Sequence, residues 1–135
     1  MTNVLIIDSA ATGDSSVTRR LTGEIEAILR GRGPVRIVRR DVGTDTIPHL
    51  TAETTPAIRG AEPITEAARE ALALSDALIA ELQAADLVVI GAPMYNFGIA
   101  STLKTWFDHV LRAGITFRYS QAGPEGLLKG KKTIV

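Results

Sequence analysis

The sequence contains no cysteine and only two histidines, His49 and His109. The absence of thiols excludes disulfide scaffolds, iron–sulfur clusters, cysteine-ligated zinc sites and cysteine nucleophiles. Because neither histidine has partner ligands at a suitable spacing, we expect no metal site. We place His109 on the polar side of its helix.

An excess of charge of one sign is also missing, since fifteen Lys and Arg residues balance fifteen Asp and Glu residues. Nucleic acids and anionic membranes usually require a basic surface, so we expect neither as a partner. No apolar run approaches the roughly eighteen residues of a membrane-spanning helix. The first residues, Met1–Asp8, lack the basic leader and cleavage site of a signal peptide, and we therefore expect a cytoplasmic protein.

The 135 residues correspond to about one domain and alternate between strand and helix patterns. Two continuous apolar runs predict strands buried on both faces, Val4–Ile7 and Leu87–Ile90. Helical spacing of apolar residues predicts three helices, over 17–29, 65–82 and 101–111. We expect Thr65 to cap the second helix, and Ser101 or Thr102 to cap the third. Two further strands are predicted at Val35–Asp41, near an edge, and at the end of the chain, over 131–135. The alternation predicts a three-layer, doubly wound parallel α/β sheet.

The segments between these elements include one long irregular stretch and two short pieces. Residues 43–63 have no clear period, and we expect a binding segment, lid or interface there. Residues 117–119 predict a short extended piece, and Gly123–Gly126 has the composition of a turn.

A doubly wound sheet binds its ligand beyond the carboxyl ends of its strands, where the winding direction reverses. The first loop at such an end, Ser9–Thr18, delivers several hydroxyls to the first turn of a helix. Free N–H groups and the helix dipole can bind a phosphate there. The loop lacks both the spaced glycines of dinucleotide sites and the Gly-Lys-Ser/Thr of nucleoside-triphosphate sites, which favours a monophosphate. The alternative is that the serines only cap the helix.

The second loop, Pro93–Ala100, gathers a thioether, two aromatic rings and an amide in the segment Met94–Phe97. Aromatic residues make up only 4% of the chain, so two rings within three residues are notable. Such side chains can sandwich a flat heteroaromatic ring, and the alternative is a hydrophobic plug that closes the end of the sheet. Together, the two loops favour one bound mononucleotide, such as flavin mononucleotide (FMN).

Several segments resemble the FMN-dependent NADH azoreductases of bacteria, from end to end of the chain. The most specific is Pro93-Met94-Tyr95-Asn96-Phe97, and the others are Leu103-Lys104, Trp106-Phe107-Asp108, Arg112–Phe117, Ala71–Asp76 and Gly123–Leu127. The resemblance implies a flavodoxin-like fold with strand order 2-1-3-4-5, of which this chain ends in strand 4. It also implies a homodimer with one non-covalent FMN per subunit. That enzyme would pass two electrons from NADH or NADPH to quinones and azo compounds, cleaving the latter to amines in a ping-pong cycle.

The resemblance also assigns residues to the cofactor. The FMN phosphate would contact Ser9, Ser16, Val17 and Thr18, and the flavin ring would lie against Pro93, Met94, Tyr95, Asn96 and Phe97. The family usually has serine where Ala10 stands and Ser-Gln-Ser where this chain has Ser16-Val17-Thr18. Main-chain N–H groups survive both changes, so we expect phosphate binding to be retained.

No residue is expected to act as a catalytic acid or nucleophile, because the flavin carries the chemistry. Phe117 and Tyr119 are the candidates for stacking the flat acceptor or the nicotinamide, and the alternative is packing against the turn at Gly114. Family members extend beyond the fourth strand, so we expect 1–135 to be a single FMN-binding domain that lacks its C-terminal portion. Two other functions stay open: a flavodoxin-type electron carrier, disfavoured by the balanced charge, and a non-catalytic domain without flavin.

Overall fold

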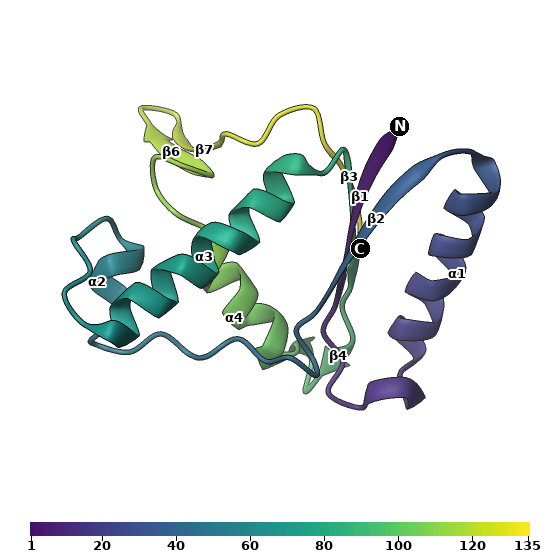
Figure 1. Cartoon of the computed structure of the whole chain (residues 1–135), viewed down its shortest axis with the longest axis horizontal. Helices are drawn as coiled ribbons and strands as arrows, with labels where there is room; N and C mark the ends of the chain where they lie inside the picture. Colours follow the sequence, from purple (N-terminus) through teal and green to yellow (C-terminus); the bar gives the residue numbers. More distant parts are fainter.

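The computed structural model describes residues 1–135 and contains one main sheet, two small hairpins and helices on both faces of the sheet (Figure 1). The strands of the main sheet are β1 (Thr2–Asp8), β2 (Val35–Asp41), β3 (Leu87–Gly91) and β8 (Lys132–Ile134). The helices are α1 (Val17–Arg32), α2 (Thr55–Ile58), α3 (Glu66–Ala84) and α4 (Ser101–Val110), with a 3-10 turn, η1, at Gly13–Ser15. The hairpins are β4 (Met94–Tyr95) with β5 (Gly98–Ile99), and β6 (Phe117–Ser120) with β7 (Gly123–Gly126).

The main sheet is entirely parallel and has the order β2-β1-β3-β8. In Figure 1, α1 lies on one side of this sheet and α3 and α4 lie on the other. The doubly wound architecture predicted from the sequence, including the edge position of β2 and a fourth strand next to β3, is confirmed. None of the helices is both long enough and apolar enough to cross a membrane.

Successive side chains of β1 point to opposite faces of the sheet, and both faces are buried. Val4 and Ile6 face α1, where Ile25 and Leu29 of that helix pack against their cluster. Leu5 and Ile7 belong to the larger core on the other face, together with side chains of α3 and α4 that include Leu78, Leu103 and Trp106. The strand is buried from both sides because each face carries its own helix layer.

Side chains cap two of the long helices at their first turns. The Oγ of Ser16 accepts a hydrogen bond from the Arg19 N–H at 3.2 Å, and Thr65 Oγ1 accepts one from the Ala68 N–H at 3.1 Å. The expected Thr65 cap is therefore confirmed. The expected cap of α4 by Ser101 or Thr102 is wrong, because the N-cap position is Ala100 and no side chain caps the helix.

Two further expectations from the sequence are wrong. His109 is not on a polar face but is 2% exposed, because it lies on the side of α4 that packs against α3, where it lines a cavity with Ala71 and Leu74 of that helix. Gly123–Gly126 is not a turn but strand β7, whose partner is β6. Pro124 is tolerated because a two-stranded ribbon has open edges that need no N–H donor. The unpatterned segment 43–63 also contains the short helix α2.

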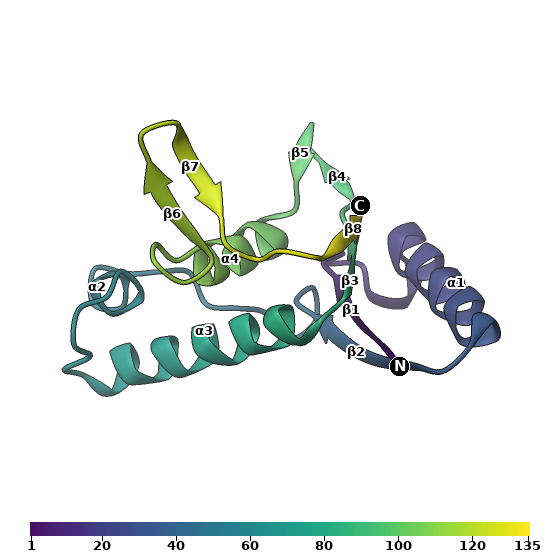
Figure 2. The same cartoon turned by 90° about the horizontal axis from the view of Figure 1, so that it is seen from above.

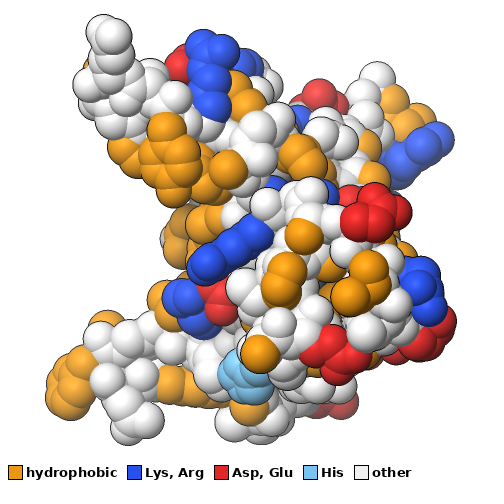
Figure 3. Space-filling view, turned by 90° about the vertical axis from the view of Figure 1, so that its left-hand side faces the viewer, with side chains coloured by type: hydrophobic (Ala, Val, Ile, Leu, Met, Phe, Trp, Pro, Cys, Tyr) orange, Lys and Arg blue, Asp and Glu red, His pale blue; other side chains and the backbone are white.

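Both hairpins project away from the main sheet in Figure 2, at well-separated positions. In Figure 3, where the left-hand side of Figure 1 faces the viewer, the β6–β7 hairpin stands at the top and the β4–β5 hairpin at the bottom, and the surface between them is hollowed. The molecule therefore has two arms on one side.

Candidate functional site

The two loops chosen from the sequence meet at the carboxyl ends of β1 and β3. Ser9 Oγ donates to the Gly91 carbonyl oxygen at 2.7 Å, and the Ala11 N–H donates to the hydroxyl oxygen of Tyr95 at 3.0 Å. Thr102 Oγ1, in the first turn of α4, donates to the Ser9 carbonyl oxygen at 2.5 Å. These three bonds join the hydroxyl-rich loop, the aromatic loop and the start of α4 into one site.

The hydroxyl-rich loop ends at the start of α1, where some backbone N–H groups of the first turn have no hydrogen-bond acceptor. The Ser16 side chain satisfies the Arg19 N–H and also shares a hydrogen bond of 3.0 Å with Thr18 Oγ1. The N–H groups of Val17 and Thr18 have no carbonyl oxygen four residues upstream within the helix. The cap expected by the alternative interpretation is present, and N–H groups beside it remain free.

Ser9 differs from the other hydroxyl residues of the loop. Its side chain is fully buried, and its proton is used in the bond to Gly91. In this structure Ser9 fixes the start of the loop to β3.

The aromatic loop is a tight hairpin with an unusual backbone. Asn96 and Phe97 both have positive φ, 51° and 66°, at the two central positions of the turn between β4 and β5. For residues other than glycine such conformations cost on the order of 1 kcal/mol each, and they concentrate at functional sites. Phe97 is 98% exposed and Met94 is 75% exposed. Neither residue plugs the end of the sheet, so an apolar surface is held open beside the helix start.

Tyr95 has a contact that the sequence could not reveal. Its hydroxyl oxygen accepts from the Ala11 N–H, so the ring spans the gap between the aromatic loop and the hydroxyl-rich loop. Tyr95 is half-buried, in contrast to its neighbours on both sides. It therefore acts as a brace between the two loops.

Phe117 and Tyr119 lie on the β6–β7 hairpin, and the structure does not bring them to the two loops of the same chain (Figure 2). Their rings form an edge-to-face pair with centroids 5.3 Å apart. The Gly114 N–H donates to the Phe117 carbonyl oxygen at 2.7 Å, which joins the backbone of β6 to that turn. Tyr119 is 74% exposed, and both rings line a cavity of about 590 Å³ together with side chains that include Phe107 and Leu111.

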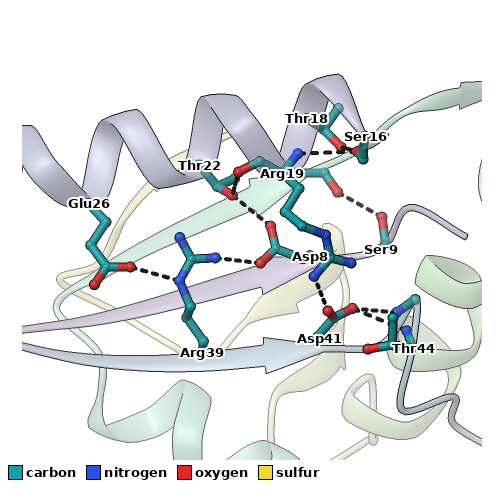
Figure 4. Close-up of polar contacts among 12 residues, drawn as sticks. Asp8, Ser9, Ser16, Thr18, Arg19, Thr22, Glu26, Arg39, Asp41 and Thr44 are labelled. Carbon is teal, nitrogen blue, oxygen red and sulfur yellow. Dashed lines mark hydrogen bonds and ion pairs between the residues drawn. The ribbon is translucent and has the colours of Figure 1, made fainter. Parts of the chain in front are cut away.

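A polar network under α1, which sequence reasoning did not find, continues from the site along the sheet (Figure 4). Asp8, at the end of β1, is 2% exposed and accepts from Thr22 Oγ1 at 2.7 Å and from Arg39 Nη1 at 2.5 Å. Arg39 also donates from Nε to Glu26 at 2.7 Å. The hydrogen bond from Arg39, followed by that from Arg30, lowers the pKa of Glu26. The buried carboxylate of Asp8 is thus held by a cation and a hydroxyl.

A second ion pair, between Arg19 of α1 and Asp41 at the end of β2, lies beside the hydroxyl-rich loop (Figure 4). The hydrogen bond from Arg19 lowers the pKa of Asp41, and the same bond raises the pKa of Arg19. The two residues lie 22 positions apart in the sequence, and no local pattern indicates that they meet.

A parallel sheet in the order β2-β1-β3-β8, with its loops gathered at the carboxyl edge, defines a doubly wound α/β domain. Domains of this class bind ligands where the winding direction reverses. Comparison with known proteins agrees, since the model of the family described as flavodoxin-like fold matches residues 2–135. The chain belongs to this flavodoxin-like fold family.

Similar proteins within that family have related names. The chain is 52% identical over 136 residues to the FMN-dependent NADH:quinone oxidoreductase of Hyphomonas neptunium, covering 100% of this chain and 65% of that protein. It is 50% identical over 137 residues to FMN-dependent NADH:quinone oxidoreductase 6 of Burkholderia lata, covering 100% of this chain and 69% of that protein.

Solved structures give the same picture. A crystal structure of an azoreductase from Bacillus anthracis str. Sterne superposes with a TM-score of 0.85 at 29% identity, over 98% of this chain and 66% of that one. An FMN-dependent NADH-azoreductase from Bacillus anthracis str. Ames Ancestor, in complex with FMN, superposes with a TM-score of 0.86 at 25% identity, again over 98% of this chain and 66% of that one. The chain thus spans about two thirds of the length of these relatives.

Proposed function

We propose that the chain forms an FMN-binding domain of an oxidoreductase that passes two electrons from NADH or NADPH to quinones and azo compounds. The names of relatives that share about 50% sequence identity with this chain support this reaction class. The observation in the structure that carries the proposal is the junction of the two loops, where the Tyr95 hydroxyl oxygen accepts from the Ala11 N–H. It places free helix N–H donors and an exposed apolar surface at one edge of the sheet.

The residues at this edge fit FMN. The unpaired N–H groups of Val17 and Thr18, with the hydroxyls of Ser16 and Thr18, would hold the phosphate at the positive end of the helix dipole. Ser9 would act by fixing the loop rather than through a free hydroxyl. The exposed side chains of Met94 and Phe97, with Pro93, Tyr95 and Asn96, would bound the flavin ring.

Bound FMN supplies the two-electron chemistry, and the chain supplies position and field. The apolar side chains of the aromatic loop would exclude water from one face of the reacting ring. The proton that accompanies reduction of a quinone or an azo group would come from water at the mouth of the site. We propose a ping-pong order because the nicotinamide and the acceptor would use the same open surface in turn.

We further propose that the protein acts as a homodimer. Large apolar side chains are exposed on both arms, with Met94, Phe97 and Ile99 on one hairpin and Tyr119 on the other. Phe117 and Tyr119 lie far from the loops of their own chain (Figure 2), so they would meet an acceptor only at the site of a second subunit. A two-fold axis would bring the β6–β7 arm of each subunit to the site of the other. The cytoplasmic location expected from the sequence stays a prediction.

A spectroscopic experiment tests the proposed function. Purified protein is incubated with FMN, freed of excess cofactor and titrated with NADH under anaerobic conditions. We expect the visible flavin bands to bleach with NADH and to return when a benzoquinone is added. Bands that bleach without return on quinone addition would favour an electron carrier. Protein that retains no flavin bands would favour a domain that binds no flavin.

A further inference from the structure

Arg19 holds the hydroxyl-rich loop at two points. Its backbone N–H is bonded to Ser16 Oγ, and its side-chain Nε donates to the Gly13 carbonyl oxygen in η1 at 3.0 Å. The remaining fork of the guanidinium reaches Asp41 through Nη1. The side chain is 20% exposed, so these contacts lie largely beneath the surface. Arg19 therefore links the middle of the loop to the end of β2.

Asp41 holds the beginning of the same loop indirectly. Its second carboxylate oxygen, Oδ1, accepts from the N–H groups of Gly43 and Thr44, both at 3.1 Å. These bonds fix the turn that follows β2, and Gly43 in that turn lies directly against the backbone of Ser9 and Ala10. A Cβ on Gly43 would lie 2.1 Å from the Ala10 carbonyl oxygen and 3.0 Å from the Ser9 carbonyl carbon.

The two carboxylate oxygens of Asp41 thus support the same loop at two points. One contacts Arg19, which bonds to Gly13, and the other holds Gly43, which lies against the backbone of Ser9 and Ala10. Neither Arg19 nor Asp41 belongs to the residues assigned to FMN above, and the pair acts from behind the loop.

We propose that the Arg19–Asp41 pair is a clamp that holds the phosphate-binding loop in its binding conformation, so that both residues are positioning residues for the cofactor phosphate. This inference rests on the proposed function for the identity of the ligand. A preorganised loop does not have to be ordered at the moment of binding, and the clamp therefore increases phosphate affinity without touching the phosphate.

The sign of the effect at Asp41 separates a clamp from simple charge. An anion near a phosphate repels it, so if only charge mattered, Asp41→Asn would tighten FMN binding. The clamp predicts the opposite result, because an amide nitrogen in place of Oδ2 can no longer accept from Arg19. Arg19→Lys keeps the positive charge but loses the planar fork that donates to Gly13 and Asp41 together. Both variants preserve or increase the local positive charge while breaking the clamp.

The chain contains a matched control for this pair. Arg40 of β2 and Glu81 of α3 form an ion pair with side chains 25% and 21% exposed, against 20% and 24% for Arg19 and Asp41. The hydrogen bond that Arg40 donates to Glu81 raises the pKa of Arg40, as the bond to Asp41 does for Arg19. Glu81→Gln thus removes a similar ion pair that makes no contact with the loop.

The experiment measures dissociation constants of FMN and of riboflavin, which lacks the phosphate, by quenching of flavin fluorescence. We expect FMN to bind about tenfold more weakly to Asp41→Asn and to Arg19→Lys, as for the loss of one charge-assisted hydrogen bond. The affinity for riboflavin should stay within about twofold of the wild-type value in both variants, and Glu81→Gln should change the affinity for neither ligand. Tighter or unchanged FMN binding by Asp41→Asn would overturn the clamp, as would an equal loss for FMN and riboflavin.

Backbone amide exchange of residues 10–16 provides a readout that needs no cofactor. In Asp41→Asn these amides should exchange about tenfold faster than in the wild type, while Glu81→Gln leaves them unchanged. Unchanged exchange in Asp41→Asn overturns the clamp whatever the ligand. If the wild type binds no FMN, the proposed function fails, and the exchange rates alone then decide whether the pair orders the loop.

Discussion

Replacement of Gly43 by alanine tests the close contact between the turn after β2 and the hydroxyl-rich loop. The added Cβ would lie 2.1 Å from the Ala10 carbonyl oxygen and 2.8 Å from the carbon of the same group. Because backbone atoms, rather than a flexible side chain, occupy that space, the two segments must separate by about 1 Å. Overpacking of this kind costs typically 1–3 kcal/mol, and we expect the upper end, about 3 kcal/mol.

Thermal unfolding measures this cost. A chain of 135 residues has an unfolding entropy near 0.28 kcal/mol/K, so about 3 kcal/mol lowers Tm by roughly 10 °C. Gly23→Ala is the matched control, because nothing lies within 4 Å of a Cβ at that helical position. It should raise stability by about 0.8–1 kcal/mol, the usual preference for alanine over glycine inside a helix. A Gly43→Ala protein that melts at the wild-type temperature would refute the close approach and the argument built on it.

Three smaller perturbations have definite expected outcomes. Thr65→Ala removes the cap on the Ala68 N–H and should lower the free energy of unfolding in urea by about 1 kcal/mol, whereas no change would show that the cap is idle. The hydrogen bond from Arg19 lowers the pKa of Asp41 in the folded state, so the ion pair contributes its full stability above the ordinary carboxyl pKa of about 3.9 and loses it as the pH falls through the lower folded-state value. The free energy of unfolding of Asp41→Asn should lack this pH-dependent contribution, and identical acid unfolding profiles of variant and wild type would contradict it. Tyr95→Phe breaks the bond to the Ala11 N–H and should weaken FMN binding about threefold to tenfold, measured by fluorescence titration, whereas equal affinity would remove the brace from the account.

The parts of the fold that follow from local patterns were predictable. Val4–Ile7 is apolar at every position because each face of β1 is covered by helices, and a continuous apolar run is the sequence signature of that environment. Thr65 sits directly before a long amphipathic stretch, and it caps that helix as its position predicts. The segments that bear the site follow from topology, since the loops after β1 and β3 must lie at one edge of a parallel sheet.

What could not be predicted depends on contacts between distant segments. The histidine of α4 reads as polar, yet its helix turns that side onto α3 and buries it. Asn96 and Phe97 have positive φ values because they form the two-residue turn of a hairpin. Of these two residue types, only asparagine favours such a turn. Arg19 and Asp41 are two charged residues among thirty and become a pair only once α1 has crossed from β1 to β2.

A crystal structure of the protein grown with FMN would locate the cofactor directly. We expect the phosphate within hydrogen-bonding distance of the Val17 and Thr18 N–H groups, and the flavin ring against the segment 94–97 at the carboxyl edge of the sheet. Electron density for FMN at any other place, such as the cavity beside Phe117 and Tyr119 of the same chain, would contradict this expectation.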